Sequence, residues 1–409
     1  MIVETSVSKN GDRLRATVVG GGIAGLASAA ALVQAGWQVT VLDRAPAFTE
    51  VGAGLAITGN GMAALDAIGA GHVVRAAGHR TRTAGFQDRR GRWLLRLPDV
   101  PPDQDGTTWV CAVHRQRLHA ALLQAAGGAD LVTGAQVIGV EAGTPAGEPA
   151  TVVWQTGTGE HTSDCDLVVA ADGVRSTVRD QLFPGTAPEY SGFTSWRAVI
   201  DDTDRIDDRF IAAWGPSTEF GALRISATQV YWYGYFRRPA GSAFHDELRA
   251  AQDHFSGWSP RVTGTVAATT ADQLMRHDVY HLPDGLPRYV RGRVVMVGDA
   301  AHAVLPTMGQ GAATALEDGA SLGRLIAAHG PADLALALAN FDRARRPRCR
   351  QIARQSVMTA RFGAHLPGGW QQSARNTLLR LVPARPFVRA GARVLRWTPP
   401  PVGAAIRNG

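Results

Sequence analysis

Residues 15–25 read RATVVGGGIAG, a short apolar strand that runs directly into a cluster of glycines. An alanine-rich helix is expected from Ile23 to Ala35, and a second apolar strand from Gln38 to Leu42 ends at Asp43. A strand, a glycine turn, a helix and a second strand ending in an acid make up the βαβ unit of Rossmann-like domains. This stretch therefore predicts an α/β fold whose first domain binds a dinucleotide.

Each glycine of the turn has a steric reason. Gly20 permits the tight turn, Gly22 lets the backbone approach a pyrophosphate, and Gly25 lets the helix pack closely against the strand. The amino end of the helix then faces the phosphates, and Asp43 can accept hydrogen bonds from the adenosine ribose. FAD and NAD share this ADP half, so the first motif alone does not distinguish them.

A second acidic motif, Asp172-Gly173, follows an apolar strand from Leu167 to Ala171. An acid at the carboxyl end of a strand, followed by a glycine and a helix, brings a carboxylate and backbone amides to the ligand-binding edge of the sheet. The same pattern also fits an ordinary strand-to-helix junction in which Asp172 or Ser176 caps the helix. The sequence leaves both interpretations open.

The third motif, Gly298-Asp299, follows a buried-type strand from Arg293 to Val297 and is the most specific of the three. Asp299 can bind a ribityl hydroxyl of a flavin, and a helix beginning near Gly311 would direct its positive end toward an anionic reduced flavin. Sites for both ends of the dinucleotide indicate bound, non-covalent FAD. The sequence therefore predicts a flavoprotein.

Composition limits the other classes of function. The chain of 409 residues is 45% hydrophobic and 19% charged, which is typical of a folded globular protein. Its net charge of +7 comes almost wholly from arginines that are scattered along the chain, so nucleic-acid binding is not expected. We find no apolar run of membrane-spanning length and no signal peptide, which predicts a cytoplasmic protein. The three cysteines lack metal-ligand spacing, so no metal site is expected.

A second domain is indicated between Tyr190 and Arg238, where the pattern changes to aromatic-rich segments of period two. This pattern predicts an inserted, mainly antiparallel β-sheet, and the chain after Gly311 is expected to be mainly helical. The predicted division is a discontinuous FAD-binding domain of residues 1–80, 105–186 and 272–380, a substrate-binding domain of residues 81–104 and 187–271, and a C-terminal helix and tail of residues 381–409.

With these motifs in this order and spacing, the sequence resembles the class A FAD-dependent aromatic monooxygenases, the para-hydroxybenzoate hydroxylase and salicylate hydroxylase-like family. The resemblance runs from Arg15 to about Gly363. Asp43 stands where the family more often has Glu, which keeps the charge but shortens the reach to the ribose. The resemblance implies that FAD is held by Gly20, Gly22, Gly25, Asp43, Arg44, Arg115, Asp172 and Asp299, with Pro306, Gly309, Gly311 and Ala312 beside the isoalloxazine.

The resemblance also implies a reaction. NADH or NADPH binds transiently and reduces FAD, and O2 then forms a flavin C(4a)-hydroperoxide that hydroxylates an electron-rich aromatic small molecule, phenolic or polycyclic. The chemistry belongs to the cofactor, and the protein supplies positioning and exclusion of water. The same motifs fit a flavin-dependent reductase or dehydrogenase, an epoxidase, or a flavin or ligand binder without turnover. Oxygen uptake that depends on substrate and NAD(P)H distinguishes a monooxygenase from a reductase and from a binder.

Substrate-selecting residues are expected on the inserted sheet. Alternation puts the tyrosines of the Val230 to Phe236 segment on one face and Trp232 on the other, without identifying the face that lines the pocket. We assign catalytic roles to Arg197, as the cation that binds an anionic or phenolic oxygen, and to Tyr233. His302 is expected to be structural. The further candidates for the pocket are Phe193, Trp196, Trp214, Phe220, Tyr231 and Tyr235.

Overall fold

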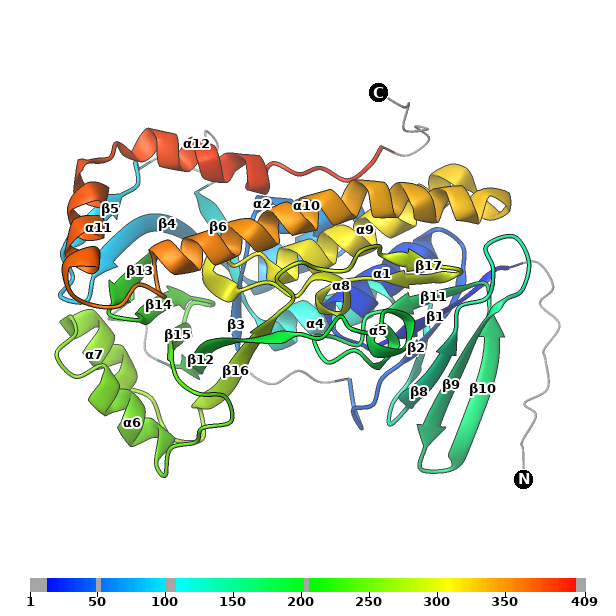
Figure 1. Cartoon of the computed structure of the whole chain (residues 1–409), viewed down its shortest axis with the longest axis horizontal. Coiled ribbons are helices and arrows are strands. Elements are labelled where there is room, and N and C mark those ends of the chain that lie inside the picture. Colours follow the sequence, from blue (N-terminus) through cyan, green and yellow to red (C-terminus); the bar gives the residue numbers. More distant parts are fainter. Residues whose placement is uncertain (1–12, 49–52, 100–107, 202–205, 402–409) are drawn as a thin grey trace.

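The computed structural model describes residues 13–48, 53–99, 108–201 and 206–401, and the strands within them form three sheets (Figure 1). The first sheet has six strands in the order β17-β18-β11-β1-β2-β7. Its members are β1 (Arg15–Val19), β2 (Gln38–Leu42), β7 (Asp130–Val132), β11 (Leu167–Ala170), β17 (Val290–Arg291) and β18 (Val294–Met296). Because β1 pairs in parallel with both β2 and β11, the carboxyl ends of these strands meet at one edge.

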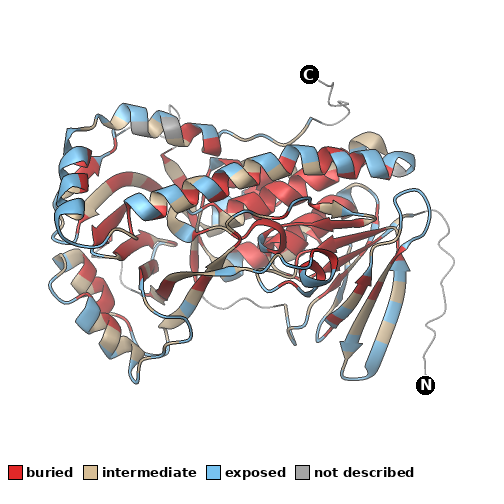
Figure 2. Cartoon of the chain, viewed as in Figure 1, coloured by how far each residue is buried: buried red, intermediate tan, exposed pale blue. Residues whose placement is uncertain are grey.

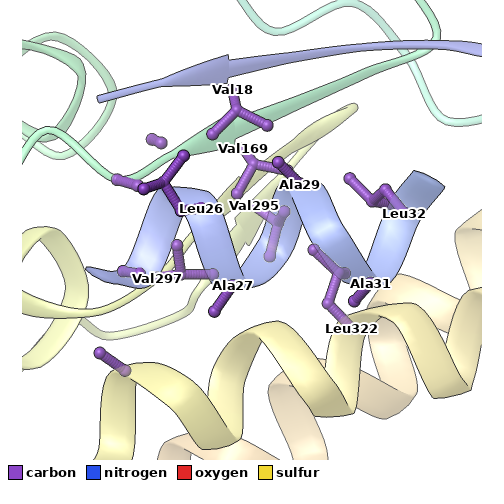
Figure 3. Close-up of a cluster of buried hydrophobic side chains, with 14 of the residues drawn as sticks. Val18, Leu26, Ala27, Ala29, Ala31, Leu32, Val169, Val295, Val297 and Leu322 are labelled. Atoms are coloured by element: carbon purple, nitrogen blue, oxygen red, sulfur yellow. The ribbon is translucent and has the colours of Figure 1, made fainter. Parts of the chain in front are cut away.

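Helix α1 (Ile23–Gln34) lies between this sheet and helix α9 (Gly311–His329), as Figure 3 shows. A Cβ added to Gly319 of α9 would lie 2.6 Å from the backbone of Ala27, and one added to Gly323 would lie 2.5 Å from the Cβ of Ala31. Glycine therefore permits this close packing. The register also shows that the two helices run parallel, so their amino ends point to the same edge.

The second sheet has nine strands in the order β16-β12-β15-β14-β13-β4-β6-β3, with β5 paired to β4. Its members are β3 (Gly54–Ile57), β4 (His79–Asp88), β5 (Trp93–Arg96), β6 (Trp109–His114), β12 (Glu189–Ile200), β13 (Arg209–Gly215), β14 (Thr218–Arg224), β15 (Val230–Arg237) and β16 (Met275–His281). Helices α6 (Glu247–His254) and α7 (Pro260–Ala267) cover one face of this sheet (Figure 1).

A smaller sheet of β8 (Gln136–Glu141), β9 (Ala150–Thr156) and β10 (Gly159–Cys165) lies at one end of the molecule (Figure 1). Figure 2 shows that buried residues concentrate around the six-stranded sheet, α1 and α9. No helix in the described parts of the chain is long and apolar enough to cross a membrane. The other helices are α2 (Gly59–Ala67), α3 (Gly71–Ala77), α4 (Arg115–Ala125), α5 (Thr177–Leu182), α8 (Asp299–His302), α10 (Leu334–Phe362), α11 (Trp370–Leu381) and α12 (Ala384–Leu395), with 3-10 turns at Pro306–Met308 and Pro331–Asp333.

The predicted α/β architecture, with an inserted, mainly antiparallel sheet and a helical C-terminal region, is confirmed. The apolar segment from Leu131 to Val140 has the composition of a single strand, but it is divided between β7 and β8, which belong to different sheets, because the chain turns at Gly134 with φ of +63°. The expected domain boundary at residue 271 falls before β16, which pairs with β12 in the nine-stranded sheet. The division into domains stays a prediction.

Candidate active site

The glycine turn after β1 leaves room for a ligand at the amino end of α1. A side chain at Gly20 would be strained by its φ of +103°, and a Cβ at Gly25 would lie 1.8 Å from the carbonyl oxygen of Gly20. At Gly22, the N-cap of α1, a Cβ would meet nothing within 4 Å, and no side chain caps the helix. The first N–H groups of α1 therefore face open space, which suits a pyrophosphate.

Asp43, at the end of β2, is bonded to this turn. Its Oδ2 accepts a hydrogen bond from the backbone N–H of Gly21 at 2.6 Å, and its Oδ1 accepts one from that of Ala45 at 2.8 Å. A carboxylate has further lone pairs with which it can accept from a ribose hydroxyl. Arg44 follows at the surface. Asp43 thus stabilises the glycine turn, a contact that the sequence motif did not predict.

The Asp172 carboxylate is hydrogen-bonded to the start of the helix that follows it. Its Oδ1 accepts a hydrogen bond from Oγ of Ser176 at 2.6 Å, and its Oδ2 accepts one from the backbone N–H of Val178 at 3.1 Å. Burial raises the pKa of Asp172, although these hydrogen bonds oppose the rise. The helix-cap interpretation describes these contacts, and a role for Asp172 in FAD binding stays a prediction.

Asp299 begins α8 just after β18, where the turn passes close to α1. Gly298 has φ of +58°, and a Cβ on it would lie 2.6 Å from the Cβ of Ala24. The Asp299 side chain is accessible to solvent, and yet burial raises its pKa while the charges of His302 and Arg115 oppose the rise. Protein atoms therefore surround an accessible carboxylate. Asp299, Arg115 at the start of α4, and the amino end of α1 come together here.

The amino end of α9 lies on the same edge. Before it, Gly309 has φ of +61°, in the left-handed region, after the turn that begins at Pro306. Gln310 is the N-cap of α9, but its side chain does not cap the helix. Its amide is instead hydrogen-bonded to Thr58 at 3.1 Å and to Asn60 at 2.9 Å. The first turn of α9, with Gly311 and Ala312, is thus left without a side-chain cap and suits an anionic group.

A buried network behind this loop ties the Gly298 turn to α9 and α10. Asp318 accepts hydrogen bonds from the backbone N–H of Gly298 at 2.9 Å, from Nε2 of His302 at 2.5 Å and from Nε of Arg345 at 2.7 Å. Burial alone would lower the pKa of His302, but Cys349 and Asp318 outweigh it and hold this pKa well above its usual value. His302 is therefore a buried cation, which agrees with its expected structural role.

The same cluster has the residue types of a metal site. Ligand atoms of His302, Asp318 and Cys349 lie within 4.8 Å of one another, all in buried residues. The guanidinium of Arg345 contacts both Asp318 and Cys349, with Nη2 lying 3.5 Å from Sγ. Because a cation of the chain already neutralises these groups, an ion-pair network explains the cluster better than a metal does.

The tyrosine face of the nine-stranded sheet turns toward the elements that carry the glycine motifs. Tyr231 packs against Ala53, which precedes β3, while Tyr235 packs with Leu305, next to the turn before α9, and with Ala360 of α10. The alternation predicted for β15 is therefore confirmed. This face can reach the cofactor site, whereas the opposite face is covered by α6 and α7.

Trp196 and Phe220 lie on the face that α6 and α7 cover, so they do not belong to the predicted pocket. Both are buried in a core with Trp232 and Phe255, because Trp196 on β12 and Phe220 on β14 each pair with Gly234 of β15, a position between the tyrosines. Trp214 lies in a separate small core with Leu94 and Leu379. By strand register Trp214 still shares the tyrosine face, because it pairs with Glu219, which pairs with Tyr235. Phe193 and Arg197 are the other pocket candidates outside β15 on this face.

Arg197 is half-buried near the middle of this face. It lies opposite Tyr233 on one neighbouring strand and Met275 on the other, and its Nε donates to Oγ of Ser195 at 3.4 Å. Burial raises the pKa of Tyr231, and the charges of Arg197 and Arg115 both oppose this rise. Arg197 lies on β12 and Arg115 at the start of α4, so cations from two separate elements influence the pKa of the same tyrosine.

Tyr233 points its hydroxyl at a buried acid. The hydroxyl donates to Oε1 of Glu219 at 2.6 Å, and Nε1 of Trp214 donates to Oε2 at 2.8 Å. Burial raises the pKa of Glu219, and the two hydrogen bonds oppose the rise. The Tyr233 hydroxyl can still accept a hydrogen bond, but its proton is already used. A catalytic role for Tyr233 stays a prediction, and sequence reasoning missed Glu219 altogether.

His277 on β16 is a candidate site residue that sequence reasoning did not find. It pairs with Ser195, which puts it diagonally across the strands from Arg197, at a typical Cα separation of about 7–8 Å. The side chain is exposed, and within the described chain its ring has no hydrogen-bond partner. Burial, then Arg197 and Arg115, lower the pKa of His277. No motif marks this residue, and only the strand register identifies it.

Comparison with known proteins identifies the family. The family model described as "FAD binding domain" matches residues 13–356. The chain belongs to this family. The expected resemblance to class A FAD-dependent aromatic monooxygenases is thereby confirmed.

This chain is similar to several monooxygenases over almost its full length. Aurachin C monooxygenase/isomerase of Stigmatella aurantiaca is 32% identical over 394 residues, with 94% of this chain and 99% of that protein covered. The 2-heptyl-3-hydroxy-4(1H)-quinolone synthase of Pseudomonas aeruginosa is 31% identical over 375 residues, with 90% of this chain and 94% of that protein covered. Klebsiella pneumoniae HpxO, solved with FAD and uric acid, has the same fold, with a TM-score of 0.81 at 24% identity over 93% of this chain and 96% of that one.

The chain is therefore an FAD-dependent monooxygenase of an aromatic substrate. The residues present fit FAD, because the opening at Gly22 faces the uncapped amino end of α1 and an accessible acid, Asp299, lies near the uncapped amino end of α9. The prediction of bound FAD is confirmed at the level of the family. The individual FAD contacts stay predictions.

Proposed function

We propose that this monooxygenase hydroxylates an electron-rich nitrogen heteroaromatic ring, with NADH or NADPH as the electron donor. The ring would carry a hydroxyl or carbonyl oxygen and an apolar substituent. The observation that supports this most is the grouping of Arg197, His277 and Arg115 beside the apolar wall around Tyr231. Cations suit an oxygen that gains negative charge, and the wall suits the apolar part. The name of the quinolone synthase, which is 31% identical, describes such a ring with a heptyl chain.

FAD would be held along the edge where the two parallel helices begin. We assign the pyrophosphate to the amino end of α1 and the ribityl chain to Asp299, and we expect Arg115 to approach the flavin from α4. When bound, FAD would supply the redox chemistry by which electrons from NAD(P)H and one atom of O2 reach the ring of the substrate. The proposed contacts are those of Gly20, Gly22, Gly25, Asp43, Arg44, Arg115, Asp172, Asp299, Pro306, Gly309, Gly311 and Ala312.

Arg197 would bind the hydroxyl or carbonyl oxygen attached to the ring of the substrate. Its guanidinium is held along Ser195 rather than in an ion pair with a described acid, so its charge stays available for an anionic or phenolic oxygen. The side chain is half-buried, which strengthens such an interaction compared with one at the open surface. Arg197 is therefore the residue that orients the substrate.

His277 would remove the acidic proton of the substrate. Its lowered pKa keeps the imidazole neutral near pH 7, so Nδ1 or Nε2 can accept a proton from a ring O–H or N–H. Ionised phenols and quinolones are more electron-rich and thus better acceptors of an electrophilic oxygen. Because the ring is exposed, the proton can pass on to water.

The test is a panel of substrates offered to the FAD-loaded protein with NADH or NADPH. We expect 2-heptyl-4(1H)-quinolone to stimulate both oxidation of the nicotinamide and O2 uptake, with one oxygen added to the product by mass spectrometry. Urate and salicylate serve as comparison ligands of other ring types. Turnover of urate or salicylate without turnover of any quinolone would contradict the proposed substrate class. The cytoplasmic location stays a prediction. The oligomeric state can be measured on the same preparation.

A further inference from the structure

The exposed side of α11 is apolar. Trp370, Leu378 and Leu381 are 78%, 52% and 76% exposed. Their spacing, i, i+8 and i+11, puts them on one side of a helix. The opposite side carries Arg375 and Leu379, which are buried against the nine-stranded sheet near Trp214. The apolar stripe therefore faces solvent, although α11 is already anchored by its other side. Figure 2 shows α11 mainly in the colour of exposed residues.

The next helix, α12, repeats this spacing with arginines. Arg385, Arg389, Arg393 and Arg396 lie at i, i+4, i+8 and i+11, and all four are exposed. Buried Ala392 and Val394 hold the other side of α12 to the protein, and the carbonyl oxygen of Val394 accepts a hydrogen bond from Arg348 of α10 at 2.7 Å. Four exposed arginines thus line α12 and its C-cap, and α12 directly follows α11 in the chain (Figure 1).

The end of α10 adds to the same surface. Met358 and Phe362 are 69% and 42% exposed, and Arg354 and Arg361 are exposed on the same side of the helix. Its inner side, with Ala360, packs against Tyr235 of the tyrosine face. One helix thickness therefore separates this outer surface from the region proposed to bind the substrate.

The charge of the chain is strongly divided. Residues 343–409 contain 14 arginines and no aspartate, glutamate or lysine. They carry a charge of +14, whereas residues 1–342 carry −7, which together give the +7 of the whole chain. The arginines, which we expected to be scattered along the chain, are thus concentrated in the C-terminal part of the sequence, which includes most of α10 and all of α11 and α12. Such an asymmetry points to an anionic partner.

We propose that α11, α12 and the end of α10 form a docking surface for an anionic lipid bilayer. The apolar stripe of α11 would insert at the boundary of headgroups and acyl chains, and the arginines of α12 would bind lipid phosphates. A nucleic acid would use the arginines but leave Trp370, Leu378 and Leu381 without a partner. A second copy of the chain would bury the apolar stripe but bring the arginines of two copies toward each other. A bilayer satisfies both stripes.

The experiment is co-sedimentation of the FAD-loaded protein with vesicles, which reports on lipid binding without any enzyme assay. We expect binding to phosphatidylcholine vesicles that contain phosphatidylglycerol, little binding to pure phosphatidylcholine, and a decrease at high salt. Arg389→Gln should weaken binding about fivefold, the effect of one arginine near an anionic surface. Arg249→Gln on α6 is the matched control and should bind like wild type, since Arg249 is also exposed but lies in a different part of the fold. Trp370→Ser should weaken binding in the same way as Arg389→Gln.

Four results would overturn the proposal. They are no binding to either vesicle, equal binding to both, equal binding by the Arg389→Gln and Arg249→Gln variants, and salt-dependent binding to duplex DNA that Trp370→Ser leaves intact. Light scattering gives a further check. A dimer that dissociates in the Trp370→Ser/Leu381→Ser variant would show that a second copy covers the stripe, and would also overturn the proposal. Both positions are exposed, so FAD content and the melting temperature should stay at the wild-type values.

Discussion

Asp318 and His302 form a buried ion pair, with 2.5 Å between Oδ2 and Nε2. The same oxygen of Asp318 accepts a hydrogen bond from the backbone N–H of Gly298. The residue after Gly298 is Asp299, the acid proposed to bind the ribityl chain. This ion pair therefore fixes, from behind, the turn on which the cofactor would rest, and it does so without contacting the cofactor itself.

Replacing Asp318 with Asn should destabilise the protein and weaken FAD retention. The substitution leaves His302 and Arg345 as buried cations with one acid fewer, and breaking a buried ion pair costs roughly 3–5 kcal/mol. Urea denaturation measures the free energy of unfolding, and dialysis followed by flavin absorbance measures retention. Asp253→Asn, at an exposed acid on α6, is the control and should change the free energy of unfolding by less than about 0.5 kcal/mol. Equal denaturation curves for the two variants would remove Asp318 from this role.

The His302 pair should make stability depend on pH at both ends. The pKa of His302 is raised well above the usual 6.5, so its stabilising effect is complete below pH 6.5 and is lost as the pH rises through the folded-state value. The pKa of Asp318 is lowered from 3.8 to about 2, so its effect is lost as the pH falls below 3.8. Thermal melting at a series of pH values tests this. Above pH 6.5 the wild-type midpoint should fall more steeply with rising pH than that of His302→Gln, and parallel curves would contradict the assignment.

Gly22 and Gly25 offer a matched pair of alanine substitutions. Gly25→Ala puts a Cβ 1.8 Å from the carbonyl oxygen of Gly20, so we expect misfolding or a large loss of stability. Gly22→Ala meets no protein atom within 4 Å, so the protein should fold but lose FAD affinity, because the methyl group enters the space proposed for the pyrophosphate. Circular dichroism and flavin titration separate the two results. A Gly22→Ala variant with normal FAD affinity would mean that the pyrophosphate lies elsewhere.

Arg197→Ala should weaken substrate binding and uncouple the reaction. Without its cation the substrate is misplaced, so NAD(P)H is oxidised with release of hydrogen peroxide instead of product. FAD content should stay unchanged, because Arg197 lies on the inserted sheet. Arg197→Lys should restore part of the affinity and little of the coupling, since an ammonium lacks the planar fork of the guanidinium. Normal affinity and coupling in Arg197→Ala would make Arg197 a structural residue.

His277→Gln should remove the acid limb of the pH profile. In the wild type, kcat/KM for a substrate with an ionisable ring proton should rise with pH through a value below 6.5, the pKa lowered by burial and by the two arginines. The variant should lose about a hundredfold in kcat/KM at pH 7, and a substrate already ionised should be affected much less. His281→Gln, further along β16, is the control. An unchanged pH profile in His277→Gln would exclude it as the base.

The sequence predicted the scaffold well because its signals are local. The strand, glycine turn and helix from Arg15 to Gln34 depend on short-range sterics, and the motif at Asp299 lies at the expected junction. Alternation along Val230–Arg237 also predicted which tyrosines share a face. The sequence did not show which elements pack against that face, because this depends on how the two sheets are arranged.

The missed residues all depend on contacts between distant segments. His277 gains its position only when β16 pairs with β12. Glu219 is recognised as a buried acid of the tyrosine face only because Tyr233 and Trp214, on neighbouring strands, donate hydrogen bonds to it. The stripe of Arg385, Arg389 and the arginines that follow is visible in the sequence as a helical spacing, but its exposure requires the fold.

The most direct test of the proposed monooxygenase reaction is turnover under dioxygen labelled with heavy oxygen. The FAD-loaded protein, NAD(P)H and the quinolone should give a product that carries one labelled atom, with one O2 consumed per NAD(P)H when the reaction is coupled, and Arg197→Ala should convert most of this O2 into hydrogen peroxide. A product formed at the same rate without oxygen, or one whose added atom comes from water, would contradict a monooxygenase mechanism for this chain.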